Sequence, residues 1–81
     1  NVVAKANQSK AIQEARNIYM EAYAVDLADG VLDGKEGTES LTAKYAGYSV
    51  DTTGTTPVAK FNGTVGGYTV TLGTDGKWTA N

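Results

Sequence analysis

The first third of the chain has the pattern of one long helix. Between residues 1 and 29 there is no Pro and no Gly, and Gly30 follows as a helix stop. Apolar side chains recur at helical spacing and form a stripe on one side. Asn1 is the only residue available to cap the start of the helix. The stripe consists of Ala4, Ala11, Ile12, Ala15, Ile18, Tyr19, Ala22 and Val25.

A second set of apolar residues lies on the other side of this helix. Val2, Val3 and Ala6 point away from the stripe, so they cannot pack on the same sheet. We expect their partner to be another chain or a segment that this sequence does not contain. The far end of the helix is also apolar on its second side, and we expect a loop to wrap it. The residues there are Met20, Ala24, Leu27 and Ala28.

Residues 30–47 have the composition of a loop, with glycines in its first half. Thr38 is a suitable N-cap for a short helix, and Gly47 is a suitable stop. The sequence therefore predicts a connecting loop that contains a short helix over Glu39–Ala46, with two side chains directed inward, Leu41 and Tyr45.

Residues 48–81 read as antiparallel strands. Asn62-Gly63 is a strong hairpin signal, and Gly73–Gly76 is a second turn. Gly66-Gly67 is interpreted as a bulge or bend. Trp78 is expected to be the largest core anchor. The strands are expected at Tyr48–Thr52, Pro57–Phe61, Tyr68–Leu72 and Lys77–Ala80.

Together these elements predict one α+β domain over residues 1–81. A long N-terminal helix (1–29) packs on a three- to four-stranded antiparallel sheet (48–81), and a loop with a short helix (30–47) joins them. An apolar sheet face must be covered, and only the helix stripe is long enough to do so.

Composition narrows the chemistry. The 81 residues include no Cys and no His, which removes disulfides, thiolate metal sites and the usual general base. We therefore expect no enzyme activity, no metal and no cofactor. The net charge of −2 argues against nucleic-acid binding. No stretch is long and apolar enough to span a membrane. The start at Asn rather than Met favours trimming or processing.

Charge is distributed unevenly. Residues 1–19 are basic, with Lys5, Lys10 and Arg16 against Glu14. Residues 20–40 are acidic, and one cluster there either binds calcium or is simply solvated. We favour the solvated loop, although negative charge is unfavourable at a helix C-terminus and a cation or basic partner would relieve it. The cluster consists of Asp26, Asp29, Asp33, Glu36 and Glu39.

The run from Asn1 to Tyr19 resembles the middle of a type IV pilin, where small residues with scattered Lys, Asn and Gln lead to Ala-Arg and an aromatic residue. This resemblance implies a helix packed on an antiparallel sheet. It also implies a subunit that is membrane-anchored before assembly and then polymerises with identical copies into an extracellular, cell-surface filament. Two family features are absent, the apolar helical half with its leading glutamate and the C-terminal cysteine pair. This leans toward a Gram-positive or otherwise cysteine-free pilin.

The expected function is therefore that of a structural subunit of a type IV pilus, serving adhesion, motility or surface attachment. Two alternatives remain open: a pseudopilin of a secretion or DNA-uptake machine, and a small carbohydrate- or surface-binding module that uses the Thr-rich face of Tyr68–Leu72. The expected subunit-interface residues are Val2, Val3, Lys5, Ala6, Lys10 and Arg16.

Overall fold

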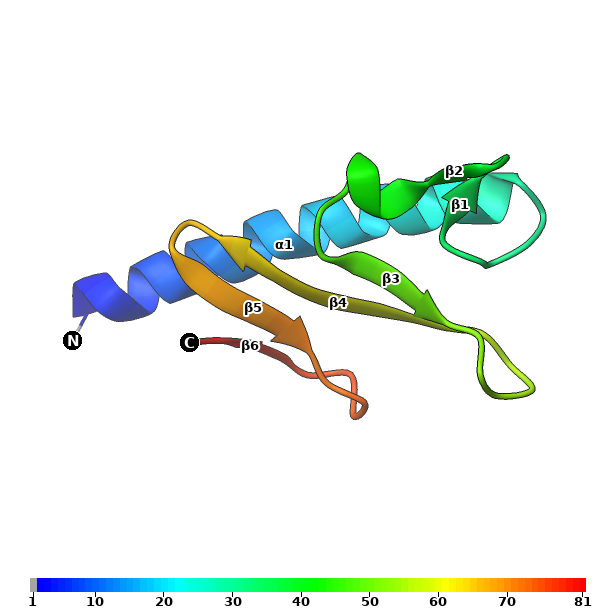
Figure 1. Ribbon diagram of the computed structural model, residues 1–81. Helices are drawn as coiled ribbons and strands as arrows, with labels where there is room; N and C mark the ends of the chain where they lie inside the picture. Colours follow the sequence, from blue (N-terminus) through cyan, green and yellow to red (C-terminus); the bar gives the residue numbers. More distant parts are fainter. Residues whose placement is uncertain (1) are drawn as a thin grey trace.

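The fold is a long helix packed on an antiparallel sheet (Figure 1). The computed structural model describes residues 2–81, with side chains from Val3 onward, so the expected cap at Asn1 and the side chain of Val2 lie outside the described part. The main sheet has the order β3-β4-β5-β6, and a separate pair, β1-β2, lies near the end of the helix. This confirms the predicted α+β class. The elements are α1 (Val2–Ala28), β1 (Lys35–Glu36), β2 (Glu39–Ser40), the 3-10 turn η1 (Leu41–Ala43), β3 (Tyr48–Asp51), β4 (Val58–Val65), β5 (Tyr68–Leu72) and β6 (Trp78–Ala80).

The helix ends where the sequence predicts. Gly30 adopts a φ of 82°, a left-handed conformation that costs a glycine little. Its N–H donates to the C=O of Leu27 at 2.9 Å, and the N–H of Asp29 donates to the C=O of Asp26 at 3.3 Å. These bonds satisfy carbonyls that the helix itself leaves without partners.

The predicted stripe faces the sheet. Ala11, Ala15 and Ala22 are buried, and their small size lets the helix backbone approach the strands closely. The larger stripe residues Ile12, Ile18, Tyr19 and Val25 are partly buried. Ala4 is the exception, because it is exposed. One turn further along the helix, Gln8 is half-buried and its Nε2 donates to the C=O of Ala80 in β6 at 3.3 Å.

Aromatic rings fill the space between helix and sheet. Trp78 contacts Tyr19 edge-on at a centroid distance of 5.4 Å and Phe61 at 5.6 Å. Trp78 is nevertheless only partly buried, because it sits on the edge strand β6. The largest fully buried side chains are Tyr48 and Phe61, on the two strands nearest the other edge. The expectation that Trp78 is the main core anchor is therefore corrected.

The predicted hairpin turn is in the wrong place. Gly66-Gly67, with φ of 58° and 84°, forms the two-residue turn between β4 and β5, flanked by the Val65–Tyr68 pair. Two positive φ values suit the type I′ turns that match strand twist. Asn62-Gly63 instead lies inside β4. A side chain would be crowded there, because a Cβ at this position would lie 3.1 Å from the Cα of Gly47.

The loop between helix and sheet also differs from the prediction. Instead of a helix over Glu39–Ala46, the chain forms the β1-β2 hairpin and the single 3-10 turn of η1. Ser40, not Thr38, is the cap, since its Oγ accepts the N–H of Thr42 at 3.3 Å. Leu41 and Tyr45 point into the core as predicted. Burying these two side chains needs only one helical turn, so a longer helix brings no additional apolar contact.

Candidate functional site

The side of α1 that faces away from the sheet is apolar at both ends. Val3 is 67% exposed, Met20 62% and Leu27 49%. Together with their neighbours these residues repeat at alternating spacings of three and four, which keeps them on one side of a helix. We call this surface the outer helix face. It consists of Val3, Ala6, Lys10, Gln13, Asn17, Met20, Ala24 and Leu27.

The expectation that a loop wraps the far end of this face is wrong. Met20, Ala24, Leu27 and Ala28 are all exposed. The loop after the helix is held on the opposite side, because the backbone N–H groups of Asp33 and Gly34 donate to the Asp26 carboxylate. Val31, which begins this loop, is also 58% exposed. Within residues 3–81, an apolar patch is therefore left uncovered at this end of the helix.

At the other end, the helix extends beyond the sheet. Residues 3–7 are all exposed, and Figure 1 shows the N-terminal turns of α1 projecting past the hairpin between β4 and β5. Val3 and Ala6 are exposed, as an interface role requires. The third apolar residue assigned to the interface, Val2, is helical, and its side chain lies outside the described part.

The three basic interface candidates do not form one patch. Lys5, Lys10 and Arg16 are all exposed. At about 100° per residue, Lys5 and Arg16 lie on the same side of the helix and Lys10 lies about a third of a turn away. Arg16 lines a shallow hollow with Met20, whereas Lys10 lines another beside Gly66 of the β4-β5 turn. Within residues 2–81 the structure shows one ion pair, which involves none of these three.

Asp26 behaves differently from the rest of the acidic cluster. Its carboxylate is fully buried and accepts three hydrogen bonds: from the N–H of Asp33 (3.2 Å), the N–H of Gly34 (2.8 Å) and the hydroxyl of Tyr48 (2.8 Å). The prediction of a solvated side chain is therefore wrong for Asp26. The sequence carried the signal, because Asp26 follows Ala22 by four residues and so lies on the buried stripe.

The other acidic residues hold turns or face water. Asp29 Oδ2 accepts the N–H of Gly37 at 3.0 Å, and Asp33 Oδ1 accepts the N–H of Lys35 at 3.0 Å. Glu36 and Glu39 are exposed and face each other across the β1-β2 pair. Among the residues that the structure describes, no group of three or more carboxylates is arranged to hold a metal ion.

The Asp26 site has a clear electrostatic consequence. Burial, followed by the hydrogen bond to Asp26, raises the pKa of Tyr48 well above its usual value. The hydroxyl is therefore fixed as a donor to the carboxylate, and both groups are satisfied without a cation. We interpret the site as structural, because a buried carboxylate with three donors offers no open position for a substrate.

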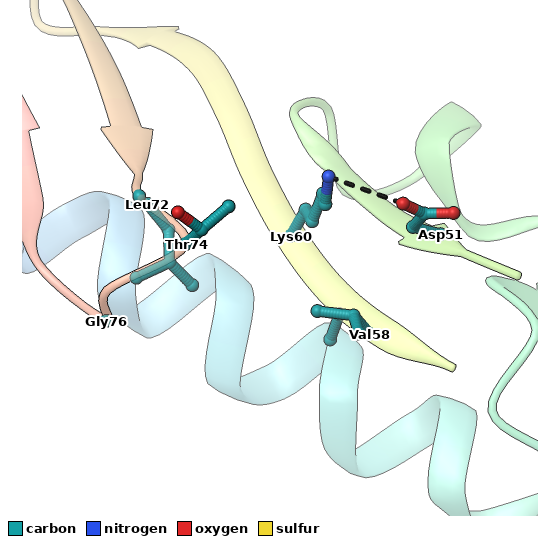
Figure 2. A pocket seen from close by; sticks show the side chains of 8 residues that line it. Asp51, Val58, Lys60, Leu72, Thr74 and Gly76 are labelled. Carbon is teal, nitrogen blue, oxygen red and sulfur yellow. Dashed lines mark ion pairs between the residues drawn. The ribbon is translucent and has the colours of Figure 1, made fainter. Parts of the chain in front are cut away.

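A recess of about 450 Å³ lies on the sheet between β4 and the turn that follows β5. Figure 2 shows Val58 and Lys60 on one side of it and Leu72 and Thr74 on the other. The Lys60 ammonium contacts Asp51 at 3.5 Å. Hydrogen bonds from the Thr53 hydroxyl and N–H, and then the Lys60 charge, lower the pKa of Asp51.

The comparisons with known proteins add no relative. The chain matches no protein-family model, and neither a curated protein nor a solved structure is significantly similar to it. No helix in the described part is both long and apolar enough to cross a membrane. What the structure defines is a small α+β domain with an outer helix face that is apolar at both ends and that its own sheet does not cover.

Proposed function

We propose that this chain is the globular part of a type IV pilin-like subunit, and that it polymerises with identical copies into an extracellular filament. The observation that supports this best is the outer helix face, which is apolar at Val3 and Ala6 and again at Met20 and Leu27. The pilin-like run from Asn1 to Tyr19 covers the first of these ends. The proposed role is structural and needs no catalytic group.

The apolar residues provide a driving force for assembly. Complete burial of a Val, Leu or Met side chain contributes roughly 1.5–3 kcal/mol. Val3, Met20 and Leu27 each keep about half or more of their surface exposed, so each could still gain part of this amount. A neighbouring copy that covers one end of the face would be stabilised by about a few kcal/mol. Contacts that are repeated head to tail do not close, and they generate filaments.

Opposite charges could set the register between copies. We propose that Lys10 and Arg16 of one subunit contact the acidic loop of a neighbour, where Glu36 and Glu39 are exposed. Each exposed pair contributes only about 0–1 kcal/mol, but a filament repeats the contact in every subunit. Because Lys10 and Arg16 lie on different sides of the helix, each would contact this loop at a different point.

A charge swap in cells that make the full-length protein tests the proposal. Changing Lys10→Glu together with Arg16→Glu should reduce the yield of surface filaments. Adding Glu36→Lys and Glu39→Lys to the same chain should restore part of it. Lys77→Glu, in an exposed turn on the far edge of the sheet, is the control and should have no effect. Unchanged filament yield and stability in the first variant would contradict the proposed contact.

Imaging and upstream sequence test the wider proposal. A filament subunit of this type should be preceded by an apolar helical segment that anchors it in the membrane before assembly. Long surface filaments labelled by an antibody against this domain are the expected result. Short filaments that stay within the envelope would favour a pseudopilin instead. The carbohydrate-binding alternative is less favoured, since the rings of Tyr48, Phe61 and Trp78 pack in the core and none of these three is available for stacking on the Thr face.

A further inference from the structure

The first half of β4 has a strand on only one side. β3 pairs with Val58–Phe61, whereas β5 pairs with residues 62–65 only. If the β4-β5 register continued, Thr74 would lie opposite Ala59. Instead the chain turns back after Leu72, and the N–H of Gly73 donates to the C=O of Lys77 at 2.8 Å. One strand position beside β4 is therefore unfilled.

The backbone of Ala59 points into this position. Hydrogen-bonding groups alternate between the two sides of a strand, and Asn62 donates toward β3, to the C=O of Gly47 at 2.9 Å. The backbone N–H and C=O groups of Val58 and Lys60 therefore also point toward β3. Those of Ala59 point the other way. No turn or loop hydrogen bond in the described part of the chain reaches Ala59.

The recess shown in Figure 2 occupies this unfilled position. Its sides carry apolar groups, with Val58 51% exposed and Leu72 across the gap. The charge of Lys60 is already balanced by Asp51 at 3.5 Å. The recess therefore combines one free backbone donor and acceptor with an apolar, nearly neutral surface.

We propose that this recess binds the end of an extended apolar peptide, which adds a short strand by pairing with Ala59. Backbone pairing at an unfilled strand position is how extended peptides join sheets. The position is in line with β5, so a peptide that continued through it would run into Leu72. Only a chain end fits. This site is on the sheet, away from the outer helix face, and the inference does not depend on filament assembly.

A titration of the isotope-labelled 81-residue chain with acetyl-Val-Ala-Val-amide tests this inference. We expect the largest amide shifts at Ala59 and its neighbours in β4 and at Gly73. N-methylation of the central Ala removes the donor to the Ala59 C=O and should weaken binding by about tenfold. N-methylation of the last Val blocks an N–H that points away from β4 and should have little effect.

A pair of valine variants provides the second arm. Val58→Thr should weaken binding several-fold, whereas Val31→Thr, at a similarly exposed valine outside the recess, should leave it unchanged. Equal binding of the two N-methylated peptides, or shifts confined to side chains with none at the Ala59 amide, would overturn the proposal. The assay uses the monomeric domain, so its failure would say nothing against the filament proposal.

Discussion

The Tyr48 hydroxyl donates a 2.8 Å hydrogen bond to Oδ2 of Asp26, which joins the first strand of the main sheet to the last turn of the helix. The same oxygen accepts the N–H of Gly34 at 2.8 Å. One buried carboxylate therefore connects helix, loop and sheet. By holding the loop on the sheet side, it leaves Met20 and Leu27 exposed.

Replacing this carboxylate should loosen the loop. In Asp26→Asn the amide keeps the volume but directs an NH₂ group toward at least one of the buried donors. We expect a loss of about 1–3 kcal/mol in the free energy of unfolding, measured by urea denaturation. Amide exchange at Asp33 and Gly34 should accelerate most. Asp29→Asn, three residues further and exposed, is the matched control. Equal stability of the two variants would contradict a central role for Asp26.

The raised pKa of Tyr48 predicts sensitivity to alkali. Above the ordinary tyrosine pKa of about 10, the unfolded chain releases this proton while the folded chain keeps it. The contribution of Tyr48 to the free energy of unfolding is therefore fully present below that pH. It falls as the pH rises, by up to about 1.4 kcal/mol per pH unit. Tyr48→Phe should flatten this part of the curve in a comparison of urea midpoints across pH. A curve unchanged in the variant would assign the effect to another group.

Gly47 is a position where only glycine fits. Its φ is 101°, and a Cβ there would lie 2.8 Å from Cζ of Phe61. Gly47→Ala should cost more than about 1 kcal/mol, from the left-handed backbone and from displacement of the ring. Gly54→Ala is the control, because a Cβ there would lie 3.9 Å from the C=O oxygen of Thr56. It should change the free energy of unfolding by less than about 0.5 kcal/mol when the two variants are compared by thermal unfolding.

The exposed apolar residues should matter for assembly and not for folding. Met20→Ser and Leu27→Ser should change the unfolding free energy of the isolated domain by no more than about 0.5 kcal/mol, because neither side chain is buried. In the full-length protein the same changes should reduce filament yield. A large loss of domain stability would show instead that these residues belong to the fold.

The pKa of Asp51 should depend on Thr53 more than on Lys60. Thr53 contributes both a hydroxyl and a backbone donor to the carboxylate, and Lys60 contributes its charge at 3.5 Å. Thr53→Val removes the hydroxyl donor and keeps the backbone donor, so it should raise the pKa of Asp51 part of the way toward its ordinary value. Lys60→Met should raise it less. An NMR titration of the side-chain carboxyl measures both. The opposite order would show that the ion pair dominates.

Much of the fold could be read from the pattern of residues. Helical periodicity located α1, Gly30 its end, and the alternation of Tyr68, Val70 and Leu72 the inward face of β5. The hairpin was misplaced because Asn62-Gly63 satisfies local turn preferences as well as Gly66-Gly67 does. Local preference cannot detect that Gly63 instead approaches Gly47 closely, because Gly47 is distant in sequence.

The helix, its two faces and the α+β class could be predicted from the residues alone, because these features depend on periodicity and on glycine stops within a short span. The burial of Asp26, the position of the loop on the sheet side and the missing neighbour of β3-paired residues 58–61 on the β5 side of β4 emerge only once the chain is folded. These features depend on contacts between distant segments. The carboxylate of Asp26 is satisfied only when residues 33, 34 and 48 converge on it, and no local pattern encodes that convergence.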